Sequence, residues 1–276
     1  MLSRVRAVVS AAHPGPSIVV ALVAVALGVV TGLPGDRIAL VGAMILANQV
    51  SVGWSNDALD AERDREAARL EKPAVRGDVS ARALLIMAVV CAGVAIALSV
   101  PLGGAAAIAH LVFLIAGWAY NAGLKRTLAA SACYIVGFAS LPLIVTLARE
   151  DPQPAAWWAI AIGGTLGFAA HVANVLPDLD ADARHGIRSL PHFLGPRWSG
   201  VAALVALAAA GVVGALGPRD LTVVGTLGLA ASASLLVAGL VVVATRPTSR
   251  ALFRIIMLSS LTAVVTLAGA SSAIVG

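Results

Sequence analysis

Ten of the fourteen acidic side chains in this 276-residue chain fall in two short segments. Residues 57–78 hold seven of them, and residues 178–182 hold three aspartates. Carboxylate oxygens are the ligands that Mg²⁺ prefers, and the ion commonly keeps waters and substrate phosphates in its remaining positions. The two segments therefore indicate divalent-cation chemistry, provided that the fold brings them together.

The first segment places three aspartates on one side of a helix. If the apolar stretch before it continues as helix, Asp57, Asp60 and Asp64 stand at i, i+3 and i+7 and point within about 60° of one another. Glu62 points roughly the opposite way. The spacing thus separates three convergent carboxylates from a solvated one.

The second segment repeats this pattern 118 residues later. The series Asn56, Asp60, Asp64 recurs as Asn174, Asp178, Asp182. The repeat predicts two similar helix ends that face each other. Like charges at helical spacing destabilise one another, so a bound cation is the simplest reason for the arrangement. We expect Mg²⁺ at five of these residues: Asp57, Asp60, Asp64, Asp178 and Asp182. For the remaining acids of the two segments we expect solvated loops that pair with neighbouring arginines.

Basic residues accompany both acidic segments. Lys72 follows the first, and Arg188 follows the second. Lys125 and Arg126 lie at the end of the fourth predicted span, which is the second helix of the stretch 83–124 described below. Mg²⁺ between carboxylates, with Lys or Arg on the free oxygens, suits a diphosphate group. The alternative is that these cations only reflect the excess of Lys and Arg in cytoplasmic loops.

The elements that must position these residues are membrane-spanning helices. Hydrophobic residues make up 59% of the chain, charged residues only 12%, and mean hydropathy is +0.94. A soluble domain carries about 25% charged residues, so a soluble enzyme and a disordered chain are both excluded. Eight stretches lack Asp, Glu, Lys and Arg: 7–35, 38–56, 83–124, 127–148, 152–177, 198–218, 221–245 and 255–276.

The longest stretch, 83–124, is interrupted by Pro101, Gly103 and Gly104, so we read it as a hairpin of two helices. The sequence therefore predicts an all-α polytopic membrane protein, with nine transmembrane helices bundled around a central cavity. We expect residues 1–276 to form a single transmembrane domain with an internal repeat near 56–64 and 174–182.

The distribution of Lys and Arg predicts the orientation. Nine spans place 16 of the 19 basic residues on the side of the N-terminus and 3 on the other. By the positive-inside rule the N-terminus is cytoplasmic and the C-terminus outside. Both aspartate segments are then cytoplasmic. We expect an integral multi-pass protein of a bacterial cell membrane that contacts anionic lipids, with no nucleic-acid partner.

Three motifs resemble those of the UbiA superfamily of intramembrane prenyltransferases, over nearly the whole chain. They are Asn56-Asp57-x-x-Asp60-x-x-x-Asp64, then Tyr120-Asn121-x-x-Leu-Lys125-Arg126, and Asp178-x-x-x-Asp182-x-x-x-Gly186 followed by Ile-Arg188-Ser-Leu-Pro. Departures are Val175, where many members have a polar or acidic residue, an extra Asp180, and His13-Pro14 in place of a common Arg-Pro.

The resemblance implies Mg²⁺-dependent transfer of a prenyl group from a prenyl diphosphate to an acceptor. Such a reaction belongs to the transfers of alkyl or aryl groups other than methyl. The five aspartates would hold two Mg²⁺, and eight residues would contact the substrate: Asn56, Lys72, Tyr120, Asn121, Lys125, Arg126, Asn174 and Arg188. An electron-rich acceptor, preferably an aromatic or quinone precursor, would attack an allylic cation. No residue is assigned as catalytic, and no motif sets the donor chain length or the oligomeric state.

Other functions remain open at this stage. They are an ion-coupled membrane transporter, a UbiA-like terpene cyclase, an alcohol phosphotransferase and a partner subunit with reduced activity. His171 either joins helices or contacts the acceptor or diphosphate. Asn48, Gln49 and Ser51 either line the cavity or join helices by hydrogen bonds.

Overall fold

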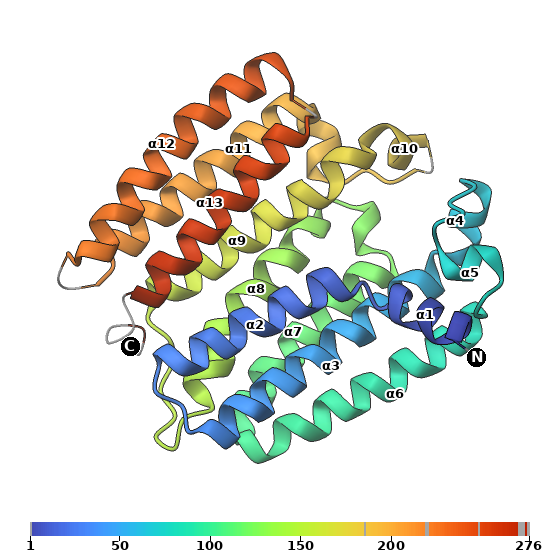
Figure 1. Cartoon of the computed structure of the whole chain (residues 1–276), viewed down its shortest axis with the longest axis horizontal. Helices are drawn as coiled ribbons and strands as arrows, with labels where there is room; N and C mark the ends of the chain where they lie inside the picture. Colours follow the sequence, from blue (N-terminus) through green and yellow to red (C-terminus); the bar gives the residue numbers. More distant parts are fainter. Residues whose placement is uncertain (1, 185, 219–220, 248, 270–273, 275–276) are drawn as a thin grey trace.

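The computed structural model describes residues 2–184, 186–218, 221–247, 249–269 and 274, and only the backbone of residues 2–4, 180 and 181. The described part is helical and contains no β-strand (Figure 1). The α-helices are α1 Leu2–Ala11, α2 Pro14–Val30, α3 Gly35–Leu59, α4 Ala61–Glu66, α5 Pro73–Arg76, α6 Ala81–Ser99, α7 Gly104–Ala122, α8 Ala129–Leu147, α9 Trp157–Val175, α10 Leu179–Arg184, α11 Leu190–Leu216, α12 Val223–Thr245 and α13 Arg250–Gly269. Three short 3₁₀ turns are η1 Val100–Leu102, η2 Leu124–Arg126 and η3 Leu176–Asp178.

The long helices are built to cross a membrane. Eight of them are long and apolar enough to span it, and α2 joins them if it is taken together with residues 5–11 of α1, from which it bends by 58°. These nine segments match the nine predicted spans. The hairpin break is also confirmed, because Gly103 begins α7 with φ +104°, a conformation that favours glycine.

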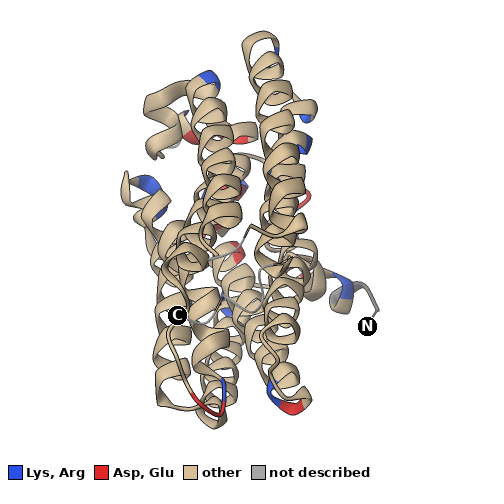
Figure 2. Ribbon diagram, turned by 90° about the vertical axis from the view of Figure 1, so that its left-hand side faces the viewer, with Lys and Arg blue, Asp and Glu red and all other residues tan. Residues whose placement is uncertain are grey.

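Apolar side chains cover the outer surface of these helices. Ile86, Val90, Ile115 and Val241 are each more than half exposed on spanning helices. Most charged residues lie at helix ends and in loops, and the ribbon between them is mainly uncharged (Figure 2). A soluble protein rarely exposes so much continuous apolar surface, so the chain is an integral membrane protein whose outer helix faces contact lipid.

The helices form a ring. Helix α3 packs against α2 and α6, and α8 packs against both α7 and α9. Helix α11 packs against α9, α12 and α13, and α13 closes the ring by contacting α2. In Figure 1 the N-terminal helices α2, α3, α6 and α7 occupy one side and α9 and α11–α13 the other, with α8 between them. The predicted central cavity is lined by residues of α2, α3, α7, α8 and α9.

Polar side chains tie the spanning helices together inside the ring. The Nδ2 atom of Asn48 in α3 lies 3.1 Å from Nε2 of His110 in α7. Ser51 Oγ donates to the Ala88 carbonyl in α6 at 2.8 Å and accepts from Trp118 Nε1 in α7 at 3.0 Å. Asn48 and Ser51 therefore join helices rather than line a cavity, as buried polar groups in lipid require.

Two arginines join α8 to α2 and α3 at the end opposite the aspartate segments. Arg37, in the first turn of α3, donates from Nη1 to the Ala148 carbonyl after α8 at 2.7 Å. Arg149 in turn donates to the Thr31 carbonyl after α2. The last carbonyls of a helix lack partners within the helix and carry partial negative charge. Arg37 thus caps α8, and Arg149 caps α2.

Helices α8 and α9 approach each other at glycines. A Cβ added at Gly167 would lie 2.2 Å from the Tyr134 carbonyl oxygen, and one at Gly163 would lie 2.5 Å from the Phe138 carbonyl oxygen. Small residues four apart are typical of such close helix contacts in membranes. This contact places Tyr134 and Phe138 against the central cavity.

We expect Gly167→Ala to lower the melting temperature of the purified protein by several degrees. Overpacking of this kind costs about 1–3 kcal/mol, and the opposing atom is backbone and cannot rotate away. Gly93→Ala in α6 is the matched control, because a Cβ there meets nothing within 4 Å. The control should leave stability unchanged or raise it. Equal melting temperatures for the two variants would contradict the tight contact.

Candidate functional site

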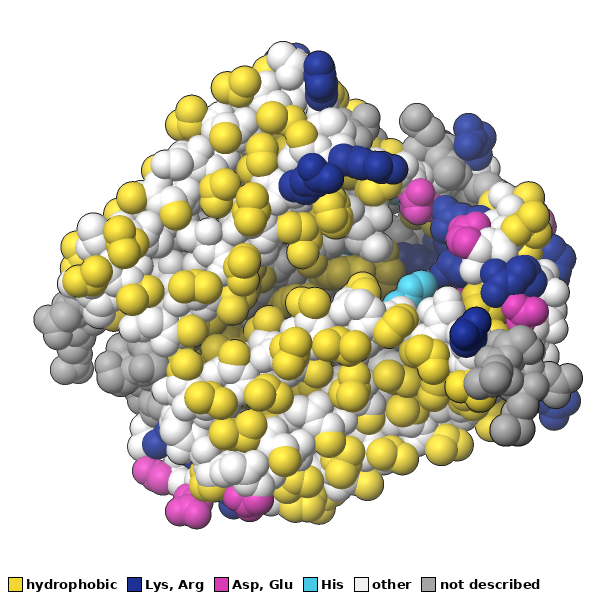
Figure 3. Space-filling model, in the orientation of Figure 1, with side chains coloured by type: hydrophobic (Ala, Val, Ile, Leu, Met, Phe, Trp, Pro, Cys, Tyr) yellow, Lys and Arg dark blue, Asp and Glu magenta, His cyan; other side chains and the backbone are white. Residues whose placement is uncertain are grey.

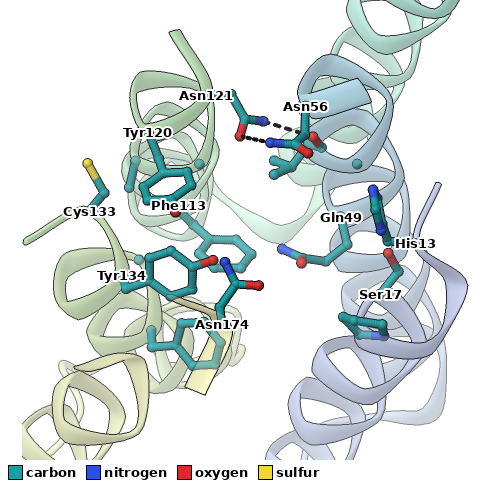
Figure 4. A pocket seen from close by; sticks show the side chains of 17 residues that line it. His13, Ser17, Gln49, Asn56, Phe113, Tyr120, Asn121, Cys133, Tyr134 and Asn174 are labelled. Atoms are coloured by element: carbon teal, nitrogen blue, oxygen red, sulfur yellow. Dashed lines mark hydrogen bonds between the residues drawn. The ribbon is translucent and has the colours of Figure 1, made fainter. Parts of the chain in front are cut away.

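A cavity of about 230 Å³ lies between α2, α3, α7, α8 and α9. Figure 4 shows the aromatic rings of Phe113, Tyr120 and Tyr134 on one side and Gln49 pointing across the cavity toward Asn174. The other lining residues are His13, Pro16, Ser17, Val52, Gly53, Asn56, Ala116, Gly117, Asn121, Cys133, Gly137 and Phe138. The wall is thus mostly apolar, with a few amides and hydroxyls. Gln49 is a cavity residue, unlike its neighbours Asn48 and Ser51.

The first aspartate segment is buried beside this cavity. Helix α3 ends at Leu59 and α4 begins at Ala61, and the helical hydrogen bonding continues across Asp60, since Asp64 N donates to the Asp60 carbonyl at 2.8 Å. Asp57, Asp60 and Asp64 are 1%, 4% and 2% exposed. Glu62, by contrast, is 77% exposed and pairs only with Arg65. The three aspartates are thus buried and Glu62 is solvated, as the helical spacing predicted; their joint binding of a metal stays a prediction.

Each buried aspartate is held by a cation. Asp57 Oδ1 binds Lys72 Nζ and also lies 2.9 Å from His13 Nε2. Asp60 binds the buried Lys125 through Oδ1 and Arg63 through Oδ2, the latter at 2.9 Å. Buried carboxylates are unfavourable without such partners. The cluster thus neutralises most of its own charge.

Arg69 brings the two aspartate segments together. Its Nη2 lies 3.2 Å from Asp178 Oδ2, and its Nη1 lies 3.9 Å from Asp64 Oδ1. The chain reaches this position because α4 ends at Glu66 and Ala68 adopts φ +51°, which turns the backbone away from the helix axis. The predicted meeting of the two segments is therefore found, through a cation that the sequence reasoning did not single out.

Burial and charge act on the ionisable groups of this cluster that lie outside the spans. Burial raises the pKa of both Asp64 and Asp182, although neighbouring arginines partly oppose the rise. Burial lowers the pKa of Lys125, with Asp60 acting in the opposite direction. The pKa of Arg69 is raised because Asp178, Asp64 and Asp182 outweigh the effect of its burial. Burial thus disfavours the charged forms of Asp64, Asp182 and Lys125, whereas the surrounding carboxylates favour the charged form of Arg69.

Two carboxylate oxygens of the first segment accept no hydrogen bond from the described residues. They are Asp57 Oδ2 and Asp64 Oδ1, both buried. A buried carboxylate oxygen without a donor is costly, and a hard divalent cation is a ligand that such oxygens suit. Among the described residues no three His, Cys, Asp or Glu side chains converge as a ready-made metal centre, because Lys72, Lys125, Arg63 and Arg69 stand between them.

Two asparagines connect the cluster to the cavity. Asn56 Nδ2 lies 3.2 Å from both Asp60 Oδ2 and Asn121 Oδ1. Asn121 Nδ2 in turn donates to the Val52 carbonyl and to Ser55 Oγ, both at 2.8 Å. Asn56 therefore lies where the cavity meets the carboxylates, and Asn121 fixes its position relative to α7.

The structure separates the remaining predicted residues into two groups. Tyr120 and Asn174 line the cavity. Arg126 and Arg188 are exposed, and neither forms an ion pair with a described carboxylate. Their assignment to a substrate stays a prediction. Asp182 is partly buried in α10.

Several residues of the site were missed from the sequence: His13, Arg63, Arg69 and Tyr134. Arg63 could have been found, because it lies three residues after Asp60 on the same helix face. His13 could not, since 44 residues separate it from Asp57 and no motif joins them. Tyr134 shares the cavity wall with Tyr120, at a ring-centroid distance of 5.1 Å.

His171 lies behind the cavity wall. Its ring is fully buried, and neither ring nitrogen has a hydrogen-bond partner. It packs against the rings of Tyr134 and Tyr120, at centroid distances of 5.1 and 6.0 Å. His171 therefore supports the two tyrosines from behind and does not line the cavity.

Comparison with known proteins finds one family and several similar structures. The model of the UbiA prenyltransferase family matches residues 16–270. A UbiA homologue from Archaeoglobus fulgidus bound to GPP and Mg²⁺ has a TM-score of 0.71 at 13% identity, over 96% of this chain and 99% of that one. The apo UbiA homologue from Aeropyrum pernix K1 has a TM-score of 0.70 at 18% identity, over 89% and 96%.

A third structure, described in a study of digeranylgeranylglyceryl phosphate synthase in membranes, has a TM-score of 0.70 at 16% identity, over 96% of this chain and 98% of that one. No curated protein sequence matches the chain. At these identities the likeness of the structures shows a common fold.

Proposed function

The chain belongs to the UbiA prenyltransferase family, and on this premise we propose that it transfers a prenyl group from a prenyl diphosphate to an acceptor within the membrane. The observation that carries the proposal is the pair of aspartate segments, linked by Arg69 at one end of a cavity with aromatic walls. A diphosphate and an apolar chain need these two environments side by side. A structural relative holds GPP together with Mg²⁺.

We propose Mg²⁺ as the cofactor. The five aspartates would hold it, and Asp57 Oδ2, which accepts no hydrogen bond from the described residues, fits a hard cation. When bound, Mg²⁺ neutralises the charge that develops on the departing diphosphate. The ion pairs Lys72–Asp57 and Lys125–Asp60 would then break, and both lysines would donate hydrogen bonds to diphosphate oxygens instead. Asn56 is placed to donate to the same group at the cavity end.

The cavity wall would hold the prenyl chain and keep water away from it. Phe113 and Phe138 are apolar, and Tyr120 and Tyr134 present aromatic faces. Aromatic faces attract positive charge, so an allylic carbon that gains charge as the diphosphate leaves is stabilised there. Excluding water prevents hydrolysis of such a centre.

For the acceptor we propose an aromatic or quinone precursor. Gln49 and Asn174 face each other across the cavity and offer amide donors and acceptors to ring hydroxyl or carbonyl oxygens (Figure 4). Transfer to a ring carbon forms one carbon–carbon bond, breaks the carbon–oxygen bond to diphosphate and releases the proton of that ring carbon. The released proton can leave with the diphosphate.

We further propose that residues 1–276 form one transmembrane domain with the aspartate segments on the cytoplasmic face. The 16 to 3 distribution of Lys and Arg supports this orientation. The N-terminus would then be cytoplasmic and the C-terminus outside, in a bacterial cell membrane.

The test uses purified full-length protein in detergent. The protein is incubated with Mg²⁺, with a geranyl, farnesyl, geranylgeranyl or longer prenyl diphosphate, and with a host extract of lipids and quinone precursors. We expect Mg²⁺-dependent diphosphate release and a prenylated product, whose mass identifies the acceptor. Asp182→Asn should abolish release. A cyclised hydrocarbon product would instead assign a terpene cyclase, and ion-driven uptake without diphosphate release would assign a transporter.

The orientation has its own test in membrane vesicles. A prenyl diphosphate supplied from outside should react in inside-out vesicles, where the cytoplasmic face is exposed, and not in right-side-out vesicles until detergent is added. Reaction only in right-side-out vesicles would reverse the proposed orientation.

A further inference from the structure

The C-terminal third of the chain carries arginines that form no ion pair with any described carboxylate. After Asp182 the sequence contains only one acidic residue, Asp220, which precedes α12, whereas Arg246, Arg250 and Arg254 follow that helix. All three arginines are exposed, and in the described part of the chain none of them forms an ion pair. Dark blue side chains mark the ends of α12 and α13 in this region of Figure 3.

A second cavity, of about 600 Å³, opens beside these arginines. Its lining is mainly apolar, with one guanidinium and one hydroxyl: Leu176, Pro177, Leu179, Pro196, Ser249, Arg250 and Phe253. Volumes of this size are typical of small-molecule sites. The cavity is separate from the first one, because the two share no lining residue.

The location of this cavity is the membrane boundary. Arg250 is the first residue of α13, and Leu176 follows the last residue of α9, so the cavity lies where two spanning helices end. Trp198 and Phe193 are each 64% exposed next to Pro196 in α11. Aromatic side chains in such positions are typical of the lipid head-group region.

The acidic side chain that lies between two lining residues of the cavity forms no ion pair with Arg250 in the described structure. Asp178 lies between Pro177 and Leu179, but its Oδ2 is bound to Arg69 on the side of the first aspartate segment. Arg254 stands four residues after Arg250, on the same face of α13. The cavity therefore combines an apolar interior with the exposed guanidinium of Arg250 at its rim.

We propose that this cavity binds an anionic phospholipid of the surrounding leaflet. The lipid phosphate contacts Arg250, with Arg254 and Ser249 close by. The part of its acyl chains next to the head group packs against Phe253, Leu179 and Pro196. Basic residues at the membrane surface attract anionic lipids, and the apolar lining favours a lipid over a soluble phosphate. The wall of the cavity is the segment that carries Asp178, so the bound lipid supports that segment from behind.

The test is native mass spectrometry of the delipidated full-length protein with phosphatidylglycerol or phosphatidylcholine of identical acyl chains. We expect preferential binding of phosphatidylglycerol, and Arg250→Gln should weaken that binding about fivefold. Arg82→Gln is the matched control, because Arg82 is also exposed and unpaired near the start of a spanning helix, α6. It should change binding less than twofold. Phe253→Ser should weaken both lipids.

Three results would overturn the proposal. The first is equal binding of the two lipids, and the second is an equal effect of Arg82→Gln and Arg250→Gln. The third is complete displacement of the lipid by millimolar inorganic phosphate, which would assign a simple phosphate site. Melting curves of each variant show whether the fold is retained. None of these readouts depends on prenyl transfer, so the proposal stands or fails separately from the proposed activity.

Discussion

Asp60→Asn should lower kcat/KM for the prenyl diphosphate by about a hundredfold to a thousandfold, the usual loss when one group that stabilises transition-state charge is removed. Asp60 binds Lys125, Arg63 and Asn56 at once. The amide keeps the shape of the carboxylate but carries no charge, so it binds a divalent cation and both basic partners more weakly. Steady-state kinetics with varied Mg²⁺ measures the loss.

The matched control is Glu62→Gln, two residues along the same segment. Glu62 is exposed and pairs only with Arg65, so its variant should retain activity within about twofold. Surface ion pairs of this kind contribute little. A melting curve for each variant separates loss of chemistry from loss of fold. Similar kinetics for Asp60→Asn and Glu62→Gln would falsify the assignment of the buried aspartates.

Lys125→Met should have the second-largest effect, with kcat reduced about a hundredfold. Lys125 is 5% exposed and has Asp60 as its partner. In the proposed reaction the ammonium group of Lys125 leaves Asp60 and binds the departing diphosphate. Loss of one such contact costs about 100-fold or more in kcat. The methionine fills the same space, which limits the structural change. Single-turnover kinetics at saturating donor isolates this step.

Arg126→Gln is the neighbouring control. The two basic residues are adjacent in one motif, but Arg126 is exposed and makes no ion pair with a described carboxylate. Its variant should lose less than about fivefold, since an exposed charge contributes little in water. A larger loss for Arg126→Gln than for Lys125→Met would show that Arg126 turns inward when the donor binds.

Hydropathy alone predicts most of this fold. In lipid, an uncharged stretch of about 20 residues forms a helix, because a helix pairs all backbone N–H and C=O groups within the segment. Each predicted stretch contains such a helix. The break at Gly103 was predictable because glycine readily adopts its positive φ. The packing partners were not, since hydropathy does not specify which helices touch. The internal repeat near 56–64 and 174–182 stays a prediction.

The site was predictable only where helical spacing governs it. Asp57, Asp60 and Asp64 lie on a helix that continues, so their shared face followed from the sequence. Arg69 lies beyond Ala68, whose left-handed conformation no helical extrapolation anticipates. Arg126 and Lys125 are adjacent in the motif, yet only one is buried, because the 3₁₀ turn η2 points them apart. A sequence motif thus identifies candidate residues, but the local backbone turn determines the direction of each side chain.

The reciprocal caps made by Arg37 and Arg149 join α8 to α2 and α3 at the end opposite the aspartates. Arg37 in α3 binds the carbonyl that follows α8, and Arg149 binds the carbonyl that follows α2. If these helices separate when a donor enters, the bonded end should move least. We therefore expect the widening at the end that carries the aspartates.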